Sequence, residues 1–157
     1  MGRRERPARA VNPGFPDLWI AARAELAFSG MKAQQCVAMT IEEIAKRLVA
    51  YCREAKWETA QRELYADGAV SIEPYETPAF EKETKGLQAI IEKGKKFDAM
   101  VGEMHELKVS EPIVATNAFA CTMLMDVTMK GQERMKMSEL CVYEVKNGKI
   151  VAERFFA

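Results

Sequence analysis

The chain has 157 residues, 48% of them hydrophobic, and its 23 Lys and Arg balance its 23 Asp and Glu. This length suits one domain with a substantial apolar core. The balanced charge argues against nucleic acid as a partner, because nucleic-acid binding needs a concentrated basic face. No stretch approaches the roughly 18 consecutive apolar residues of a membrane span, so we expect no membrane partner either.

Residues 1–38 differ in character from the rest of the chain. They hold six Lys and Arg against three acids, and Arg23 with Glu25 interrupts the apolar run that a secretory signal would need. We expect them to be a poorly structured or dispensable extension, with the folded domain at residues 39–157. The alternative is a docking arm that packs the face around Trp19 on the domain or on a partner.

Three helices are predicted before the long strands begin. Thr40 and Glu43 form a capping box, and apolar residues then recur at helical spacing as far as Cys52. Similar stripes follow twice more. We therefore expect helices at residues 40–56, 57–64 and 85–101.

Between the second and third helices the sequence predicts a short strand. Residues 66–68, Ala-Asp-Gly, are typical of a turn, and Val70 and Ile72 then begin the strand. Pro74 ends it, because proline cannot donate a hydrogen bond within a sheet. Residues 75–84 are expected to form a loop over the mouth of the fold.

The C-terminal half alternates apolar and polar residues with period two, which predicts strands near residues 104–114, 118–130, 132–145 and 149–156. Helices followed by long strands in one short domain indicate an α+β fold. We expect a curved antiparallel sheet that forms a cone-shaped half-barrel packed on three N-terminal helices.

The turn around Gly131 sets the register of the two longest strands. If Gly131 is its centre, the facing pairs are Cys121 with Cys141, Met123 with Glu139, and Asp126 with Lys136. The last pair is then an ion pair on the outer face. The two cysteines become small apolar core residues, although a disulfide between them is geometrically conceivable.

Glu139 falls on the apolar face of its strand. A carboxylate there is costly unless it is paired, hydrogen-bonded or facing a wet cavity. The last hairpin leaves open whether a second acid faces the interior. A two-residue Asn147-Gly148 turn would place Ile150 and Arg154 inside, whereas a three-residue loop would place Glu153 inside. We favour Glu153.

Cysteine and histidine patterns predict no metal site. Cys36, Cys52, Cys121 and Cys141 form no CxxC pair, and His105 is the only histidine. We expect no metal and no organic cofactor, and the free cysteines favour a cytoplasmic location. His105 shares its expected face with Leu107 and Val109. Near a buried glutamate it could carry a proton.

Over residues 39–157 this pattern resembles the SnoaL-like branch of the nuclear transport factor 2-like superfamily. The features that carry the resemblance are the segment 64–70 (LYADGAV), the Glu73-Pro74 pair, the Lys85-Gly86-Leu87 helix start and the segment 145–151 (VKNGKIV). The superfamily includes polyketide cyclases, ketosteroid isomerases, dehydratases, epoxide hydrolases and members without chemistry. The resemblance also implies a homodimer through the open sheet face, here residues 120, 122, 124, 140 and 142.

By position, the resemblance places Glu73 where ketosteroid isomerases carry their general base. It also favours Glu153 facing inward. The oxyanion tyrosine of those isomerases falls near Val49, and their second acid falls near Cys141. The chain therefore departs from a ketosteroid isomerase at both positions.

Three functional hypotheses follow. The first is a cofactor-free isomerase, cyclase or hydratase acting on a small apolar carbonyl compound through the candidate catalytic residues Glu73, Glu139, Glu153 and His105. Its pocket would be lined by Trp57, Tyr75, Met123, Met125, Met137 and Phe155. The second is a binding or dimerisation module with the same cavity and no turnover. In the third, the buried acids satisfy one another and serve only the structure.

Overall fold

The computed structural model describes residues 38–157, so the expectations for the N-terminal extension, for Trp19 and for Cys36 lie outside the described residues. The described residues, 38–157, belong to one compact unit. Its three helices are α1 (Ile41–Arg53), α2 (Trp57–Leu64) and α3 (Leu87–Met100). Its strands are β1 (Tyr65–Ile72), β2 (Glu83–Lys85), β3 (Val101–Val109), β4 (Ile113–Val114), β5 (Ala118–Met129), β6 (Arg134–Lys146) and β7 (Lys149–Phe156).

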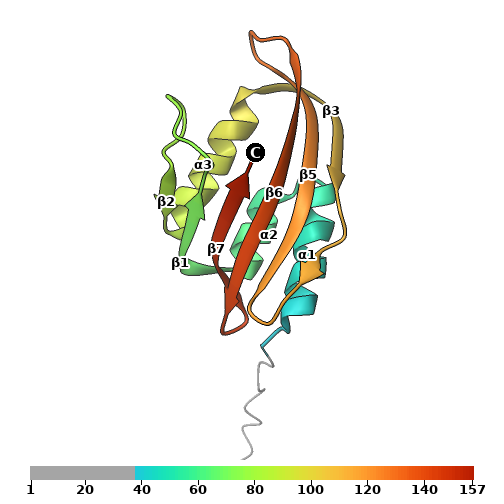
Figure 1. The fold of residues 1–157 in the computed structure, drawn as a ribbon. Coiled ribbons are helices and arrows are strands. Elements are labelled where there is room, and N and C mark those ends of the chain that lie inside the picture. The colour runs from blue at the N-terminus through green and yellow to red at the C-terminus, as the bar shows by residue number, and fades with distance from the viewer. Residues whose placement is uncertain (1–37) are drawn as a thin grey trace, which may run out of the picture. The chain divides into compact units, whose positions relative to one another are not determined.

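The strands form one seven-stranded sheet that is not closed, in the order β2-β1-β7-β6-β5-β3, with β4 paired to β5. The helices cover one face of this sheet, and the long strands β5 and β6 curve across it (Figure 1). The expected α+β fold is confirmed. The sheet is mixed rather than wholly antiparallel, because β1 runs parallel to β7. This parallel pairing joins the first and last strands. The sequence pattern predicts hairpins between neighbouring strands and therefore did not predict a pairing between strands this far apart in the chain.

Helix α1 begins where the capping box predicts. The Thr40 hydroxyl accepts a hydrogen bond from the Glu43 amide at 3.2 Å, and the Glu43 carboxylate accepts one from the Thr40 amide at 2.8 Å. Its buried stripe is Ile44, Ala45, Leu48, Val49 and Cys52. These side chains form the part of the core that lies against the sheet.

The predicted boundaries of two strands were wrong. The turn expected at residues 66–68 lies inside β1, where the pairing with β7 jumps from Tyr65–Ile150 to Val70–Ala152. The strand expected near residues 104–114 is two strands, β3 and β4, separated at residues 110–112. Pro112 lies in that gap, and its ring nitrogen has no hydrogen to donate to a neighbouring strand.

The register of β5 and β6 agrees with the prediction from Gly131. Cys121 faces Cys141, Met123 faces Glu139, and Asp126 faces Lys136. The described cysteines Cys52, Cys121 and Cys141 are all buried and free, so they act as small apolar core residues as expected. Beside them the rings of Phe119 and Tyr143 stack with centroids 4.9 Å apart.

The last hairpin turns Glu153 inward, as expected, but for a different reason. Its turn has two residues, Asn147 and Gly148, both with positive φ, and Lys146 pairs with Lys149. Between the pairs Glu144–Ala152 and Val145–Ile150 the register shifts, which leaves Val151 as an extra residue. This bulge lets both Ile150 and Glu153 be buried.

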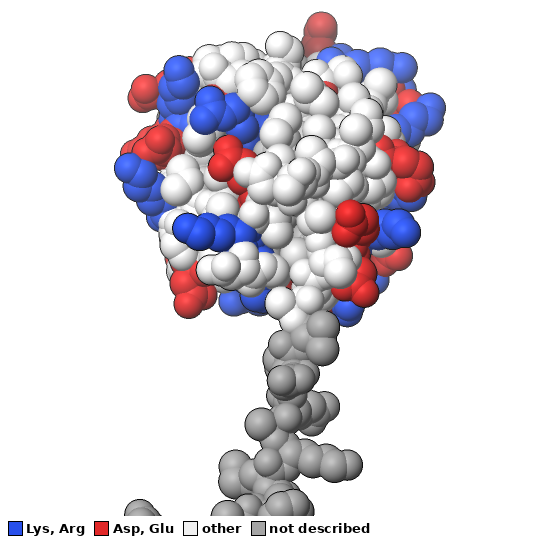
Figure 2. Space-filling model, turned by 60° about the horizontal axis from the view of Figure 1, so that its bottom comes forward, with Lys and Arg blue, Asp and Glu red and all other residues white. Residues whose placement is uncertain are grey.

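The outer face of the sheet exposes several large apolar side chains. Leu140 and Phe156 face each other on β6 and β7 and are 44% and 48% exposed. The view in Figure 2 shows acidic and basic side chains of both signs interspersed around uncharged surface. A homodimer through the outer face stays a prediction, which light scattering would test. No helix among the described residues is long and apolar enough to cross a membrane.

Candidate functional site

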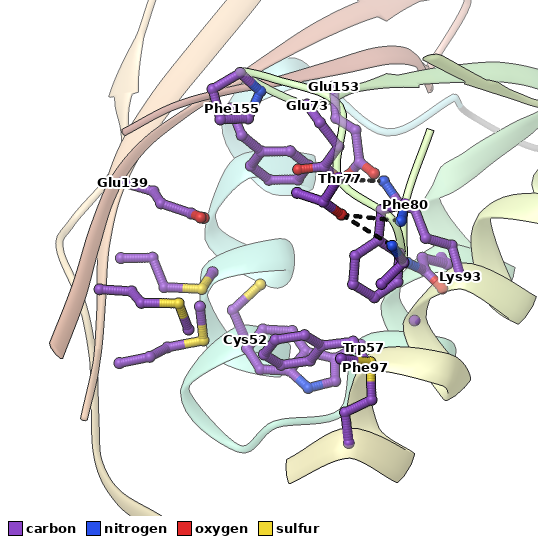
Figure 3. Close-up of a pocket in the computed structure, with 18 of the residues that line it drawn as sticks. Cys52, Trp57, Glu73, Thr77, Phe80, Lys93, Phe97, Glu139, Glu153 and Phe155 are labelled. Atoms are coloured by element: carbon purple, nitrogen blue, oxygen red, sulfur yellow. Dashed lines mark hydrogen bonds and ion pairs between the residues drawn. The ribbon is translucent and has the colours of Figure 1, made fainter. Parts of the chain in front are cut away.

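A cavity of about 480 Å³ lies between the helices and the inner face of the sheet. Its walls are mostly apolar and aromatic. All six residues expected to line a pocket do line this cavity: Trp57, Tyr75, Met123, Met125, Met137 and Phe155. That they bind a ligand stays a prediction. Figure 3 shows acidic side chains projecting into this space from two sides.

The loop after β1, predicted at residues 75–84, supplies part of the cavity wall, and its last residues belong to the short strand β2. Thr77 and Phe80 exchange backbone hydrogen bonds of 2.9 and 3.2 Å. Lys96 on α3 holds this loop from the helix side, since its Nζ donates to the Ala79 carbonyl at 2.5 Å and lies 5.4 Å from the centre of the Phe80 ring.

Glu73 lines the cavity but is engaged by a lysine from α3. Lys93 Nζ lies 2.6 Å from Glu73 Oε1 and donates to Ser71 Oγ at 2.5 Å. Both side chains are mostly buried, at 15% exposed for Lys93 and 23% for Glu73. The Lys93 ammonium group therefore occupies Oε1 of Glu73 and fixes the position of this carboxylate.

Glu153 lies deeper, on β7, and is 4% exposed. The hydroxyl of the buried Tyr65 donates a hydrogen bond to Glu153 Oε2. Burial raises the pKa of Glu153 above its ordinary value, while the hydrogen bond from Tyr65 opposes that shift. This carboxyl is therefore held in place by a neutral donor and shielded from water.

Glu139 projects from β6 on the other side of the cavity (Figure 3), and its cross-strand neighbour on β5 is Met123. Burial raises its pKa above the ordinary value of 4.5, the nearby Glu73 carboxylate raises it further, and Lys93 opposes the shift. Among the described residues no hydrogen bond or ion pair to the Glu139 carboxyl is found. Of the three cavity glutamates, it is the one left available for a ligand.

The structure does not bring His105 into the cavity. The register shifts between Met104–Val127 and Glu106–Asp126, so β3 carries one extra residue there. Met104 therefore packs on the core, and His105 Nε2 lies 2.8 Å from Thr128 Oγ1 on the outer face. The expectation that His105 shares a face with Leu107 was wrong, because simple alternation does not include the bulge.

Lys93 is the cavity residue that sequence reasoning missed. It lies three residues after Ile90 and four before Phe97, both of which belong to the apolar stripe predicted for this helix. A lysine at that helical spacing must face the interior along with its neighbours. The signal was therefore present, as a charge within an apolar stripe.

The described residues contain no cluster of three or more His, Cys, Asp or Glu that could hold a metal ion. Cys52 lines the cavity, but burial raises its thiol pKa to about 12. Its thiol is therefore protonated at neutral pH and a poor nucleophile. The acidic and basic side chains that line the cavity in the described part of the chain are three carboxyls and one ammonium group.

Comparison with known proteins agrees with this architecture. The SnoaL-like domain family matches residues 39–157, the bounds expected for the domain. No curated protein matches. A solved protein from Mesorhizobium loti, provisionally named a SnoaL-like polyketide cyclase, is 35% identical with a TM-score of 0.71, over 76% of this chain and 100% of that one.

Two more distant structures share the fold alone. A protein from Jannaschia sp. CCS1, also provisionally named a SnoaL-like polyketide cyclase, is 14% identical with a TM-score of 0.61, over 75% of this chain and 88% of its own. A protein from Bacillus subtilis, provisionally named an isomerase, is 23% identical with a TM-score of 0.57, over 74% and 88%.

Proposed function

Because the chain belongs to the SnoaL-like domain family, we propose that its cavity takes up a small apolar carbonyl compound and that Glu139 moves a proton on it. The reaction class is isomerase, cyclase or hydratase chemistry carried by side-chain carboxyls. The 35% identical Mesorhizobium loti protein is provisionally named a SnoaL-like polyketide cyclase and also carries the name carbohydrate phosphatase; the first of these names supports this class of substrate.

The observation that carries the proposal is the state of Glu139. Its carboxyl is partly buried beside the strand position of Met123, its pKa is raised by that burial, and no partner among the described residues occupies it. A carboxyl with a raised pKa is a stronger base once ionised and can also act as an acid nearer neutral pH. Glu73 and Glu153 are already bonded, to Lys93 and Tyr65.

The chemistry is a proton transfer next to a carbonyl group. The ionised Glu139 takes a proton from the carbon beside the carbonyl, and the electron pair of that C–H bond moves onto the carbonyl oxygen to form an enolate. The protonated Glu139 then returns the proton to carbon or to oxygen.

The alternative function is a binding module without turnover. One observation favours it: two of the three cavity carboxyls already have partners, so the site offers a single carboxyl for acid–base work. In that case Glu139 serves as a hydrogen-bonding group that orients the ligand.

The proposal is tested with β-tetralone, a bicyclic ketone whose benzylic protons beside the carbonyl are acidic. The purified chain in D₂O is expected to accelerate exchange of those protons, followed by proton NMR. Glu139→Gln should reduce the rate by about 100-fold or more, because general acid–base groups contribute on that order. Glu144→Gln is the matched control, since Glu144 is an exposed glutamate of the same strand.

The pH profile gives a second readout of the same variant pair. The base works only when ionised, so the exchange rate should rise with pH through a midpoint above 4.5, in keeping with the raised pKa of Glu139. An unchanged rate in Glu139→Gln would contradict the catalytic assignment. Saturable binding of β-tetralone without any exchange would establish the binding module instead.

A further inference from the structure

The environment of Lys93 points to a role at the cavity beyond that of a counter-ion. It is the one cationic side chain among the residues that line the cavity in the described part of the chain. Its ammonium group lies 2.6 Å from Glu73 Oε1 and 2.5 Å from Ser71 Oγ. The ring of Phe155 lies beside it, with its centre 5.6 Å from Nζ. These contacts hold the ammonium group in one place.

An ammonium group has three N–H donors. Two of them are directed to Glu73 and Ser71, and no third acceptor is found among the described residues. Since Lys93 lines the cavity, the remaining donor is available to an oxygen atom of a ligand. A hydrogen bond from a charged donor is stronger than one between neutral groups, above all in a site that excludes water.

Lys93 and Glu139 face the cavity from opposite sides (Figure 3). Both side chains line the same cavity, and the positive charge of Lys93 acts to lower the pKa of Glu139. A ligand between them can place a carbonyl oxygen at Lys93 and the adjacent carbon at Glu139. This is the arrangement that enolate formation needs, with positive charge where negative charge develops.

The rest of the lining restricts the class of ligand. Three carboxyls and one ammonium group disfavour a ligand that carries a carboxylate of its own, because like charges repel within a poorly solvated site. The aromatic walls Trp57, Phe97 and Phe155 and the methionines of β5 and β6 suit a flat ring, through aromatic and sulfur–aromatic contacts.

We propose that Lys93 is a catalytic residue that binds the carbonyl oxygen of a neutral, flat, ring-containing ketone and stabilises the enolate oxygen while Glu139 moves the proton. This inference rests on the proposed function and adds the substrate class and the group that receives the developing charge. Glu73 is then a positioning residue that holds Lys93, rather than the base that its place before Pro74 suggested.

The charges balance through the step. One C–H bond breaks, its proton goes to the Glu139 carboxylate, and its electron pair ends on the oxygen beside the Lys93 ammonium group. No electrons are gained or lost by the protein. Reprotonation at carbon reverses the step, and Lys93 remains protonated throughout.

The test compares the binding of β-naphthol, whose hydroxyl occupies the place of the enol oxygen of β-tetralone, with that of naphthalene, which lacks it. Dissociation constants are measured by equilibrium dialysis. The wild-type chain is expected to prefer β-naphthol, and Lys93→Met should reduce that preference about tenfold or more while naphthalene still binds. Lys95→Met is the matched control, because Lys95 is an exposed lysine of the same helix that does not line the cavity.

Removal of Lys93 alone leaves the Glu73 carboxylate without its partner. The double variant Glu73→Gln with Lys93→Met removes both charges, so that no unpaired buried charge can destabilise the fold. Binding of naphthalene to this variant checks that the cavity persists. In the exchange assay Glu73→Gln should slow the reaction in the wild-type background and have no further effect when Lys93 is already Met. A structural role alone would give additive losses.

Failure of this inference differs from failure of the proposed function. If Lys93→Met kept the preference for β-naphthol, or if the two Glu73→Gln effects were equal in both backgrounds, the role of Lys93 would be refuted while Glu139 remained the base. If neither aromatic probe bound to the wild-type chain, the ligand class and the inference would fail together. Absorbance of bound naphtholate gives an independent reading, since Lys93→Met should raise the pKa of the bound hydroxyl.

Discussion

At the scale of single residues, Asp126 shows how a partner is chosen across a sheet. Strand register places Lys136 directly opposite, but its Nζ lies 3.5 Å from Asp126 Oδ2. Arg134, one diagonal step away, makes two hydrogen bonds to the carboxylate at 2.7 and 2.8 Å. The planar fork of arginine matches a carboxylate better than a lysine does. The expected ion pair exists, with Arg134 as the main partner.

This pairing predicts a loss of stability in acid. Hydrogen bonding from Arg134 lowers the pKa of Asp126 from 3.8 to about 2. Because the pKa of Asp126 is lower in the folded protein than in the unfolded chain, the carboxylate's contribution to the free energy of unfolding is complete above pH 3.8. It is lost as the pH falls towards 2. The free energy of unfolding of the wild-type chain, measured with urea, should therefore fall across that window relative to that of Asp126→Asn.

Asp67→Asn serves as the control, because Asp67 is an exposed aspartate of β1. The difference between wild type and Asp126→Asn isolates this one carboxyl from Glu139 and Glu153, whose raised pKa values act in the opposite direction. Parallel curves for wild type and Asp126→Asn from pH 4 to pH 2 would show that the pair contributes nothing to the acid response.

At the scale of elements, irregular pairing decides which side chains face the cavity. An extra residue in β7 at Val151 turns Glu153 inward, and an extra residue in β3 turns His105 outward. Each bulge reverses the alternation for the rest of its strand. Which strand residues face the cavity therefore depends on these two β-bulges as much as on the residue types of the strands.

The glycines of the two hairpin turns should differ in how much an alanine substitution lowers the free energy of unfolding. Gly148 has φ +72 and an added Cβ there would lie 2.9 Å from the Ala38 Cβ, whereas Gly131 has φ +74 and open space. Gly131→Ala should lower the free energy of unfolding by about 1–2 kcal/mol from backbone strain alone. Gly148→Ala should lower it further, because the clash adds to the strain.

Gly68→Ala is the control in this series, since an added Cβ meets nothing within 4 Å and φ is not positive. Its effect should stay within about 0.5 kcal/mol. Equal losses at Gly148 and Gly131, measured by urea unfolding, would rule out a contribution from the contact with Ala38.

At the scale of the whole molecule, one core holds the cavity. The buried apolar side chains of the described residues extend from Ile44 on α1 to Ile150 on β7 and form one cluster between helices and sheet. The cavity lies within this cluster and takes lining residues from all three helices. The N-terminal cap of α1 at Thr40 is complete within the same unit.

Deletion of residues 1–38 should therefore leave the melting temperature within about 2 °C of the full chain, since the cap and the described core stay intact. Calorimetry or circular dichroism of residues 39–157 beside the full chain makes the comparison. Exchange of β-tetralone protons by the shortened chain should also be retained. A large fall in melting temperature would show that the first 38 residues belong to the fold.

Much of the site could be predicted because its residues belong to regular segments. Met123, Met125 and Met137 face the cavity by plain alternation, and Glu139 follows from the register set at Gly131. Lys93 also stands at an interior position of a regular helix, and helical spacing could have identified it. His105 could not be placed in this way, because the bulge beside it depends on the hydrogen bonding of β5.

By itself the sequence determined the three helices, the long hairpin and the face on which most carboxyls lie, because helical and strand periods are local properties of the chain. Tertiary structure alone decided the parallel pairing of β1 with β7, the bulges, and the union of Lys93 with Glu73 and of Tyr65 with Glu153. These depend on contacts between segments far apart in the chain, and their energies are settled only when burial removes water from the charged groups.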